Sequence, residues 1–262
     1  MNDRSLEPVL LTSVNEGVAT LTLNRPRQYN ALSAELLEAL HRQLDGLRGD
    51  PAVRVVVIRG AGNAFCAGHD LKEMRALASQ GEVERLFGAC SAMMQKLVAL
   101  PQPVIAAVHG IATAAGCQLV AQCDLAVATE DARFAVSGVN LGLFCSTPAV
   151  ALSRNVGRKR AAEMLFTGEF IDARQALEWG LVNRVSPAGG LDASVQSFVT
   201  SLKKKPAESL ALGKALFYRQ LEAGLAAAYE DATRTIACNM ASGVAQEGVD
   251  AFLAKRPPRW ES

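Results

Sequence analysis

The amino-acid sequence predicts a mixed α/β fold, in which strand-and-helix units come first and a helical region follows. Two observations predict this fold. Short apolar runs typical of strands alternate with segments of helical periodicity as far as residue 128, with glycine-rich loops between them. After Pro148 the patterns are helical. In a chain of 262 residues we expect one principal domain, with a core over residues 1–190 and a helical region over residues 191–262 that caps the pocket.

The first unit is predicted to be a strand, a loop and a helix. Residues 17–24 alternate in polarity and are rich in strand-forming types. Pro26 ends this strand, because its ring removes a backbone donor. Ser33 then stands where it can cap a helix. The apolar residues of that helix recur at helical spacing, as Leu36, Leu37, Leu40, Leu44 and Leu47.

The second and third units repeat this order. The second has an apolar run over residues 53–58 that is typical of a strand buried on both faces. A glycine-rich loop then leads to a short helix from Leu71, and a longer helix is predicted over residues 82–100. The elements predicted for the third unit are a strand at 104–108, a small-residue turn at 110–116, a short helix from about Cys117 and a strand at 125–128. Three such units indicate a coil of similar turns.

The last part of the chain is predicted to be helical. Residues 173–179 form a helix that ends at Gly180, because glycine is common just after a helix. A long helical tract is predicted over residues 191–240. We expect this tract to cap the core.

Charge and hydropathy exclude several classes of protein. The 27 Lys and Arg almost cancel the 26 Asp and Glu, so we expect no general attraction for nucleic acid or for an anionic membrane. The most apolar stretch, residues 103–128, is interrupted by His109, Gln118, Gln122 and Asp124, so we expect no membrane span. Any anionic ligand must therefore be held by a local cluster of basic groups.

The cysteines and the first residues suggest a compartment. The six cysteines show no spacing typical of a metal site, so we expect reduced thiols, a reducing compartment and no bound metal. The opening residues carry acidic groups and no apolar signal segment follows them. We expect a cytoplasmic protein, or a protein of the mitochondrial matrix from which a transit peptide has been removed.

Two turns combine small residues with the start of a helix. One is Ala67-Gly68-His69-Asp70 before Leu71, and the other is Ala114-Ala115-Gly116 before Cys117. Small residues let a ligand approach the backbone, and the first turn of a helix has unpaired N–H donors with partial positive charge. Either turn alone is more often a place of tight packing. If both face one cavity, they form an oxyanion hole.

Many segments of the sequence resemble motifs of the crotonase (enoyl-CoA hydratase/isomerase) superfamily, and they occur in the same order along the chain. The two oxyanion segments of that superfamily resemble residues 65–72 (FCAGHDLK) and residues 103–116, with residues 123–128 (CDLAVA) after them. The resemblance continues at both ends of the chain and covers nearly all of it. Further matching segments are residues 23–26 (LNRP), 30–32 (NAL), 165–168 (LFTG), 176–182 (ALEWGLV) and 251–257 (AFLAKRP).

The resemblance implies a fold, a ligand and a site. It implies a spiral of ββα turns with a C-terminal helical trimerisation region, in a homotrimer or hexamer. The substrate is a coenzyme A thioester, and no other cofactor is implied. The oxyanion donors are the backbone N–H groups of His69 and Ala115. Contacts to the substrate are implied for Arg25, Arg27, Ala31, Ala67, Gly68, Asp70, Leu71, Lys72, Gly116 and Asn140.

This sequence departs from the superfamily at both catalytic glutamates of the hydratases. By position, these correspond here to Gln118 and Gly138. An amide does not transfer a proton near neutral pH, and glycine offers no group at all. We therefore expect weak or no hydration. Three hypotheses remain: an acyl-CoA enzyme that acts through enolate stabilisation, a decarboxylase of a malonyl- or methylmalonyl-type CoA, and a non-catalytic acyl-CoA-binding or regulatory protein.

Other polar residues have less certain roles by sequence alone. The imidazole of His69 is a candidate for proton transfer, although a histidine before an aspartate in a loop is often only hydrogen-bonded. Asp70 is expected to cap the next helix. Cys145 and Ser146 are expected to line the pocket. His41 and His109 are expected to be structural.

Overall fold

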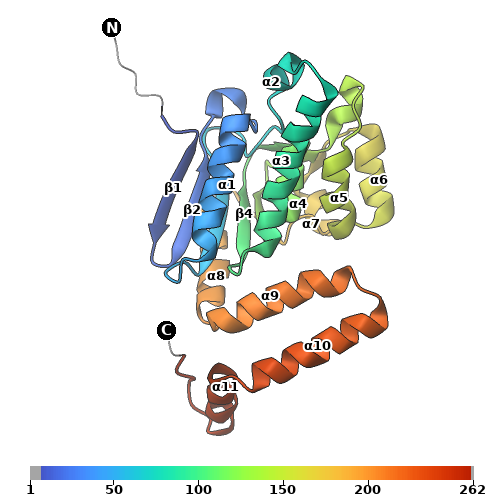
Figure 1. Ribbon diagram of the computed structural model, residues 1–262. Coiled ribbons are helices and arrows are strands. Elements are labelled where there is room, and N and C mark those ends of the chain that lie inside the picture. The colour runs from blue at the N-terminus through green and yellow to red at the C-terminus, as the bar shows by residue number, and fades with distance from the viewer. Residues whose placement is uncertain (1–6, 261–262) are drawn as a thin grey trace.

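The computed structural model describes residues 7–260 and contains two sheets (Figure 1). The larger sheet has the strand order β1-β2-β3-β4-β6-β9, and the smaller has the order β5-β7-β8. The first comprises β1 (Leu10–Asn15), β2 (Val18–Leu23), β3 (Val55–Gly60), β4 (Val104–Val108), β6 (Leu125–Thr129) and β9 (Arg184–Ser186). The second comprises β5 (Ile111–Thr113), β7 (Arg133–Ala135) and β8 (Ile171–Asp172).

The helices lie on both faces of the larger sheet and extend below it (Figure 1). Within the core they are α1 (Ala34–Arg48), α2 (Leu71–Ala76), α3 (Gln80–Ala99), α4 (Ala115–Gln122), α5 (Ser146–Asn155), α6 (Arg158–Thr167), α7 (Ala173–Glu178) and α8 (Leu191–Lys203). The last three are α9 (Ala207–Leu221), α10 (Leu225–Met240) and α11 (Gly243–Leu253). Two short 3-10 helices are η1 (Pro26–Gln28) and η2 (Ser137–Leu141).

The pairing of the strands places their ends at common edges. From β2 to β9 every neighbouring pair in the larger sheet is parallel. In the smaller sheet β5 pairs parallel with β7. The loop after β3 comes close to β5 of the smaller sheet, because the Phe65 and Cys66 N–H groups both donate to the Ile111 carbonyl at 3.1 Å. Isolated bridges join the loop to its surroundings, at Leu32 with His69 and at Cys66 with Ala112.

Several predicted elements are confirmed. Four of the residues in β3, from Val55 to Ile58, are buried, as expected for a strand covered on both faces. Helix α1 buries all the leucines that predicted it, and the Ser33 hydroxyl accepts a hydrogen bond from the Leu36 N–H at 3.1 Å. The structure thus contains the predicted strand, capped helix and second strand in the predicted order.

Other elements differ from the prediction. The turn expected over residues 110–116 contains β5, and the helix expected from Cys117 begins at Ala115. The helix expected from residue 82 begins at Gln80, because Ser79 caps it. The helical tract predicted over residues 191–240 is confirmed and comprises three helices, α8, α9 and α10. It breaks at Pro206, which has no N–H to donate, and at Gly224, which precedes α10 in an extended conformation.

The core has two layers of apolar side chains. The larger cluster joins one face of the sheet to α1, α3 and α4. On the opposite face, Val195 and Val199 of α8 pack against Val55, Ile105 and Val127. Helix α8 therefore belongs to the core, although it lies after residue 190.

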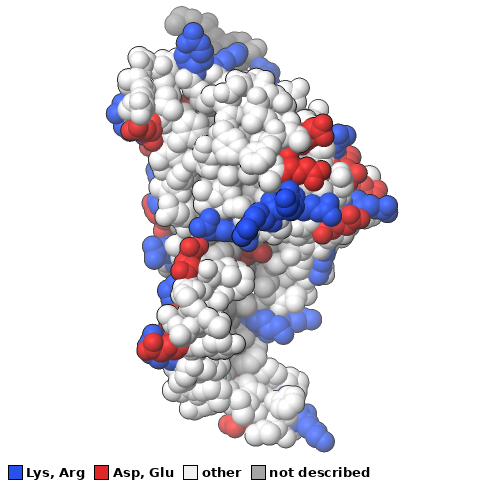
Figure 2. Space-filling model, turned by 90° about the vertical axis from the view of Figure 1, so that its right-hand side faces the viewer, with Lys and Arg blue, Asp and Glu red and all other residues white. Residues whose placement is uncertain are grey.

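We call α9 to α11, residues 207–253, the arm. Figure 1 shows the arm extending away from the sheet. Within the described residues, α9 and α10 bury no apolar side chain, and α11 buries Ala251 alone. In Figure 2 the arm forms the lower part of the molecule and is mostly uncharged, whereas a band of Lys and Arg crosses the core above it. The arm is therefore joined to the core by few apolar contacts of its own.

A buried ion pair fastens the arm to the core. The Lys214 ammonium donates to Asp124 Oδ2 at 2.6 Å, to the Leu97 carbonyl at 2.8 Å and to the Gln102 carbonyl at 3.0 Å. The Tyr218 hydroxyl donates to Asp124 Oδ1 at 2.8 Å. Burial lowers the pKa of Lys214, while Asp124 opposes this shift. We call Asp124, Lys214 and Tyr218 the latch.

Two further hydrogen bonds join the end of α8 and the residues after it to the first strands of the larger sheet. The Lys203 ammonium, at the end of α8, donates to the Glu16 carbonyl between β1 and β2. The Arg54 guanidinium donates to the Lys205 carbonyl at 2.6 Å. Residues just before the arm are thus tied to the first strands of the sheet.

Candidate functional site

The two small-residue turns lie against each other. The Thr113 hydroxyl donates to the Ala67 carbonyl at 3.0 Å, and the Thr113 N–H donates to the Cys66 carbonyl at 3.0 Å. Gly68, at φ +93°, packs directly on the second turn. A Cβ placed on Gly68 would lie 2.9 Å from the Ala114 Cβ and 3.3 Å from the Ala115 N. The structure therefore brings together the two turns that the sequence singled out.

Close backbone packing explains the small residues of the second turn. A Cβ on Gly116 would overlap the Cys66 carbonyl, so this position requires glycine. Ala114 has φ +48° and ψ −118°, a conformation that residues with a Cβ rarely adopt. Its N–H donates to the Ala135 carbonyl at 2.9 Å, which holds it there. Backbone strain of this kind costs about 1–3 kcal/mol and is concentrated at functional sites.

Each turn presents an unpaired backbone donor. The Leu32 N–H donates to the Gly68 carbonyl and the Asp70 N–H donates to the Leu32 carbonyl, so the His69 N–H between them points away from Leu32. The Ala115 N–H lies in the first turn of α4. In the described part of the chain, neither N–H donates to another protein group. Two free donors therefore stand on adjoining turns.

An ion pair joins the loop after β2 to the start of α2. Arg25 donates to Asp70 Oδ2 at 2.8 Å and to the Ala31 carbonyl at 2.6 Å. The same Asp70 carboxylate accepts from the N–H groups of Lys72 and Glu73, which confirms it as the cap of α2. Partial burial raises the pKa of Asp70, but these hydrogen bonds outweigh it and hold the pKa below its usual value.

Asn30 organises the same loop and was not singled out as a functional residue by the sequence. Its side chain is fully buried and donates to the Ala61 carbonyl at 2.8 Å and to the Ala64 carbonyl at 2.7 Å. Its Oδ1 accepts from the Arg25 N–H at 2.9 Å. Asn30 has φ +56°, which asparagine tolerates better than most residues. An asparagine one residue before a predicted contact was the signal that could have found it.

The other residues expected to contact the substrate differ in exposure. Ala31 and Gly68 are buried, and Ala67 is partly buried with its N–H donating to the Tyr29 carbonyl at 3.0 Å. Arg27, Leu71 and Lys72 are exposed on η1 and α2, beside the Arg25–Asp70 pair. Asn140 is also exposed, and its amide donates to the Gly168 carbonyl at 3.4 Å. Asn140 is thus engaged with the end of α6, apart from the two turns.

The imidazole of His69 is buried without a hydrogen-bond partner. Within the described residues neither ring nitrogen has a partner. The ring packs edge-on against Phe87, with 4.7 Å between the ring centroids. Burial lowers the pKa of His69 to about 4, so the ring is neutral at pH 7. A neutral imidazole offers one donor and one acceptor to a polar group that enters the site.

The two positions expected to correspond to the glutamates of the hydratases have different surroundings. Gln118 is buried in α4, and its Oε1 has no hydrogen-bond partner among the described residues. The Gly138 N–H donates to the Cys145 Sγ at 3.2 Å. Burial raises the pKa of the Cys145 thiol, so this sulfur is protonated at neutral pH. One position therefore keeps a free acceptor, and the other faces a neutral thiol.

Several residues have structural partners. One ring nitrogen of His41 pairs with the Ala89 carbonyl and one of His109 pairs with the Gly62 carbonyl, both at 2.9 Å, as expected for structural histidines. The Ser146 hydroxyl donates to the Phe144 carbonyl at 3.3 Å. Over residues 7–260 there is no group of three or more His, Cys, Asp and Glu side chains placed to hold a metal ion. No helix in the same range is long and apolar enough to cross a membrane.

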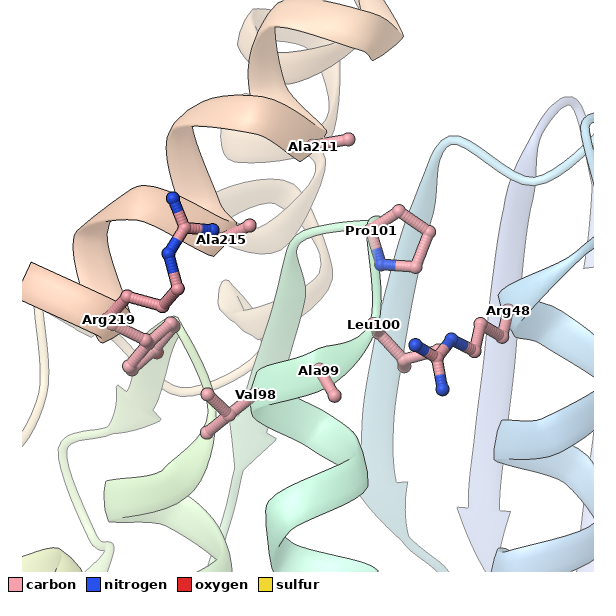
Figure 3. Close-up of a pocket in the computed structure, with 9 residues that line it drawn as sticks. Arg48, Val98, Ala99, Leu100, Pro101, Ala211, Ala215 and Arg219 are labelled. Carbon is pink, nitrogen blue, oxygen red and sulfur yellow. The ribbon is translucent and has the colours of Figure 1, made fainter. Parts of the chain in front are cut away.

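One cavity lies away from the two turns. It has a volume of about 440 Å³ and lies between the arm and the end of α3 (Figure 3). Arg48 and Arg219 stand on its two sides, and apolar side chains such as Val98 and Leu100 line it (Figure 3). None of the predicted site residues lines this cavity. It belongs to the junction of the arm with the core.

Comparison with known proteins agrees with this geometry. The family described as enoyl-CoA hydratase/isomerase matches residues 13–262. Enoyl-CoA hydratase domain-containing protein 3, mitochondrial, of Xenopus laevis is 44% identical over 253 residues, which are 97% of this chain and 86% of the relative. The human protein of that name has a crystal structure that is 41% identical, with a TM-score of 0.93 over 96% of this chain and 100% of the other.

A bacterial structure is more similar still. The crystal structure of an enoyl-CoA hydratase from Mycobacterium smegmatis is 59% identical, with a TM-score of 0.96 over 98% of this chain and 100% of that one. The match extends over the core and the arm, and it confirms the fold that the sequence motifs implied. The chain therefore belongs to the enoyl-CoA hydratase/isomerase family, the crotonase superfamily.

Proposed function

We propose that this protein binds an acyl-CoA and polarises its thioester carbonyl with the backbone N–H groups of His69 and Ala115. The observation that carries this proposal is the pair of unpaired donors on adjoining turns, one of them in the first turn of α4. Donors held in place before the reaction stabilise a developing enolate oxygen by about 2.7–4 kcal/mol each. Members of this family act on acyl-CoA thioesters, which supports the assignment.

The coenzyme A portion is proposed to lie along the loop after β2 and the start of α2. Arg25, Arg27 and Lys72 are the cationic groups there, and they suit the phosphates of coenzyme A. The Arg25–Asp70 pair holds this loop against α2, so the backbone at Ala31, Ala67 and Gly68 is positioned before the ligand arrives. The substrate itself supplies the coenzyme A, and no metal or further cofactor is proposed.

After the carbonyl is polarised, the protein is proposed to add water to the substrate slowly or not at all. Gln118 and Gly138 offer neither a general acid nor a general base, and such groups contribute about 10²- to 10⁴-fold each. The enzyme is therefore proposed to hydrate crotonyl-CoA barely or not at all while still binding it. A protein that only binds acyl-CoA is the limiting case of the same site.

Decarboxylation of a malonyl- or methylmalonyl-type CoA is a second candidate function. The unpartnered ring of His69 is the observation that favours it, because a neutral imidazole keeps one N–H that can donate to a carboxylate. The carboxylate of a malonyl-type acyl group would accept this hydrogen bond, and an unpaired buried polar atom costs about 1–3 kcal/mol. Loss of carbon dioxide leaves an enolate for the two N–H donors and requires no water. Release of carbon dioxide from malonyl-CoA separates this activity from the others.

The protein is proposed to assemble as a homotrimer or hexamer through the arm. Large apolar side chains are exposed there, which is unusual for a surface that stays in water. They include Leu225, Tyr229, Ile236, Phe252 and Leu253. A single sedimenting species of monomer mass at micromolar concentration would contradict this assembly. The vertebrate relatives are mitochondrial by name. For this chain we propose the mitochondrial matrix or the cytoplasm as the compartment.

A matched pair of ligands tests the oxyanion assignment. Crotonyl-CoA carries the thioester carbonyl, and S-butyl-CoA, a thioether, keeps coenzyme A but lacks that oxygen. Both should slow hydrogen exchange over residues 66–72, while crotonyl-CoA alone should protect the Ala115 amide. We also expect crotonyl-CoA to bind about 10-fold more tightly, because each net hydrogen bond contributes about 0.5–1.5 kcal/mol. Equal affinity and equal protection would contradict the assignment, and mass-spectrometric screening of saturated, enoyl and malonyl-type thioesters would then identify the acyl group.

A further inference from the structure

The position of the second glutamate is occupied by other atoms of the chain. A Cβ on Gly138 would lie 2.7 Å from the Leu143 carbonyl oxygen and 2.8 Å from the Cys145 Sγ. Relaxed contacts of carbon with other heavy atoms are about 3.5–4.0 Å. No side chain can therefore leave the backbone at residue 138 unless this loop moves.

The loop that contains Leu143 and Cys145 is hydrogen-bonded to both backbone groups of Gly138. The Gly138 carbonyl accepts from the Leu143 N–H at 3.0 Å, and the Gly138 N–H donates to the Cys145 Sγ at 3.2 Å. Leu143 and Phe144 are exposed at 48% and 49%, whereas Cys145 is exposed at 8%. Of these three consecutive residues, the cysteine alone is turned inward, where it meets Gly138.

The thiol also lies beside the helix that carries Gln118. Cys145 precedes α5, which packs along α4. Cys145 therefore links the segment of Gly138 to a helix that packs against the helix of Gln118.

We propose that Cys145 is a specificity-determining residue: its thiol, together with the Leu143 carbonyl of the same loop, fills the space for a side chain at position 138. It thereby excludes from the acyl group both a water for hydration and the carboxylate that would activate that water. This inference rests on the proposed acyl-CoA site. The protonated thiol is a weak hydrogen-bond donor and behaves as a small apolar group. The thiol therefore gives the side of the site near residue 138 an apolar surface that does not hold a water molecule. Such a surface suits reactions of an enolate that consume no water.

Restoring the glutamates tests the consequence for the reaction. The pair Gln118→Glu with Gly138→Glu should hydrate crotonyl-CoA no faster than Gln118→Glu alone, because the thiol and the loop block the new carboxylate. Adding Cys145→Gly removes the sulfur and the hydrogen bond that ties the loop to Gly138, so the Leu143 carbonyl is free to move aside. The rate should then rise about 10-fold or more, towards the contribution of a positioned acid or base. Adding Cys90→Ala instead, which also removes a buried thiol, should give no gain. Gln118→Glu with Cys145→Gly should remain slow, because it lacks the second carboxylate.

A stability cycle tests the shared space without any ligand. Gly138→Ala should lower the Tm by roughly 5 °C more in the wild-type background than in Cys145→Gly, because overpacking is relieved when the sulfur is absent. Gly46→Ala is the matched control, since nothing lies within 4 Å of its Cβ, and its Tm change should be the same in both backgrounds. Equal losses for Gly138→Ala in the two backgrounds would overturn the claim of shared space.

The two tests separate this inference from the proposed function. Calorimetric titration of the wild-type protein with crotonyl-CoA decides whether the site binds acyl-CoA at all, and no binding would refute the proposed function while the stability cycle still reports on Gly138 and Cys145. If the triple variant binds crotonyl-CoA as the wild type does but hydrates it no faster than the double variant, Cys145 does not determine specificity.

Discussion

The core and the arm place their apolar side chains in opposite environments. In the core, the leucines of α1 and the valines of β3 are buried against partners from the same chain. In the arm, Leu225, Tyr229 and Phe252 are exposed at 76%, 69% and 83%. The core is therefore stable through its own packing, whereas the arm presents an apolar surface and is held to the core by the polar latch. Apolar surface of this extent is typical of a face that another molecule covers.

The largest effect is expected from breaking the latch. Asp124→Ala leaves the Lys214 ammonium buried without its counter-charge, and loss of one partner of a buried ion pair costs about 3–5 kcal/mol. Tyr218→Phe removes one hydrogen bond to the same carboxylate and should cost about 1.5–3 kcal/mol. Urea unfolding measures both. A loss below about 1 kcal/mol for Asp124→Ala would mean that the arm does not depend on the latch.

A pair of leucine substitutions compares the two regions directly. Leu40→Ala opens a cavity in α1 and should lower the free energy of unfolding by about 2–5 kcal/mol. Leu225→Ala in the arm should change the stability of the isolated subunit by no more than about 0.5 kcal/mol. It should instead weaken self-association in sedimentation. If Leu225→Ala leaves association intact, the arm surface has a different role.

The two regions should also differ in their response to acid. The folded-state pKa of His69 lies near 4, below its ordinary value of 6.5, so the unfolded chain binds a proton that the folded core does not. Stability from His69 is therefore full above pH 6.5 and falls as the pH drops to about 4, by up to about 1.4 kcal/mol per pH unit. His69→Gln should remove this slope. An unchanged slope would place the acid sensitivity elsewhere.

In the arm, the Glu247 carboxylate accepts hydrogen bonds from Arg256 and from the Arg259 N–H, which lower its pKa to about 2. A carboxylate with a lowered folded-state pKa stabilises the fold above its unfolded pKa and loses that contribution as the pH falls. The arm should therefore respond between about pH 4.5 and pH 2, below the window of His69. Titration of Glu247 followed by NMR tests this order.

The smallest effect is expected at the ion pair beside the two turns. Arg25→Ala should weaken acyl-CoA binding by about 10-fold, because it frees the loop after β2 and removes a cation. The exposed pair of Arg42 with Glu38 offers a control, since Arg42→Ala should cost only about 0.3–0.5 kcal/mol of stability and leave binding unchanged. Equal binding losses would indicate a general effect of positive charge.

Local patterns predicted the elements whose partners are near in sequence. The apolar run at β3, the Ser33 cap of α1 and the Asp70 cap of α2 were all predicted, because each depends on residues a few positions apart. Strand β1 was missed, since its residues after Leu10 are exposed and show no alternation of burial. The helical character of residues 191–240 was predicted, whereas the bounds of its three helices were not.

The sequence predicted the two small-residue turns of the candidate site, but it did not predict which side chains surround them. Glycine and alanine before two helices indicated the turns, because close backbone packing demands small residues. The contact of Gly138 with Cys145 was not predicted, since a glycine in the sequence does not reveal which atoms fill the space beside it. Nor did the sequence indicate the latch, whose Lys214 and Asp124 lie 90 residues apart.

The polar contacts that anchor the last part of the chain also set an order of folding. The Glu16 carbonyl accepts a hydrogen bond from Lys203, and Asp124 accepts one from Lys214. Both acceptors are synthesised long before the lysines that donate to them. Contacts this distant in sequence form late and slow the folding of a domain. The arm has no docking place until β4, β6 and α3 have come together. A subunit with an incomplete core therefore cannot orient its arm.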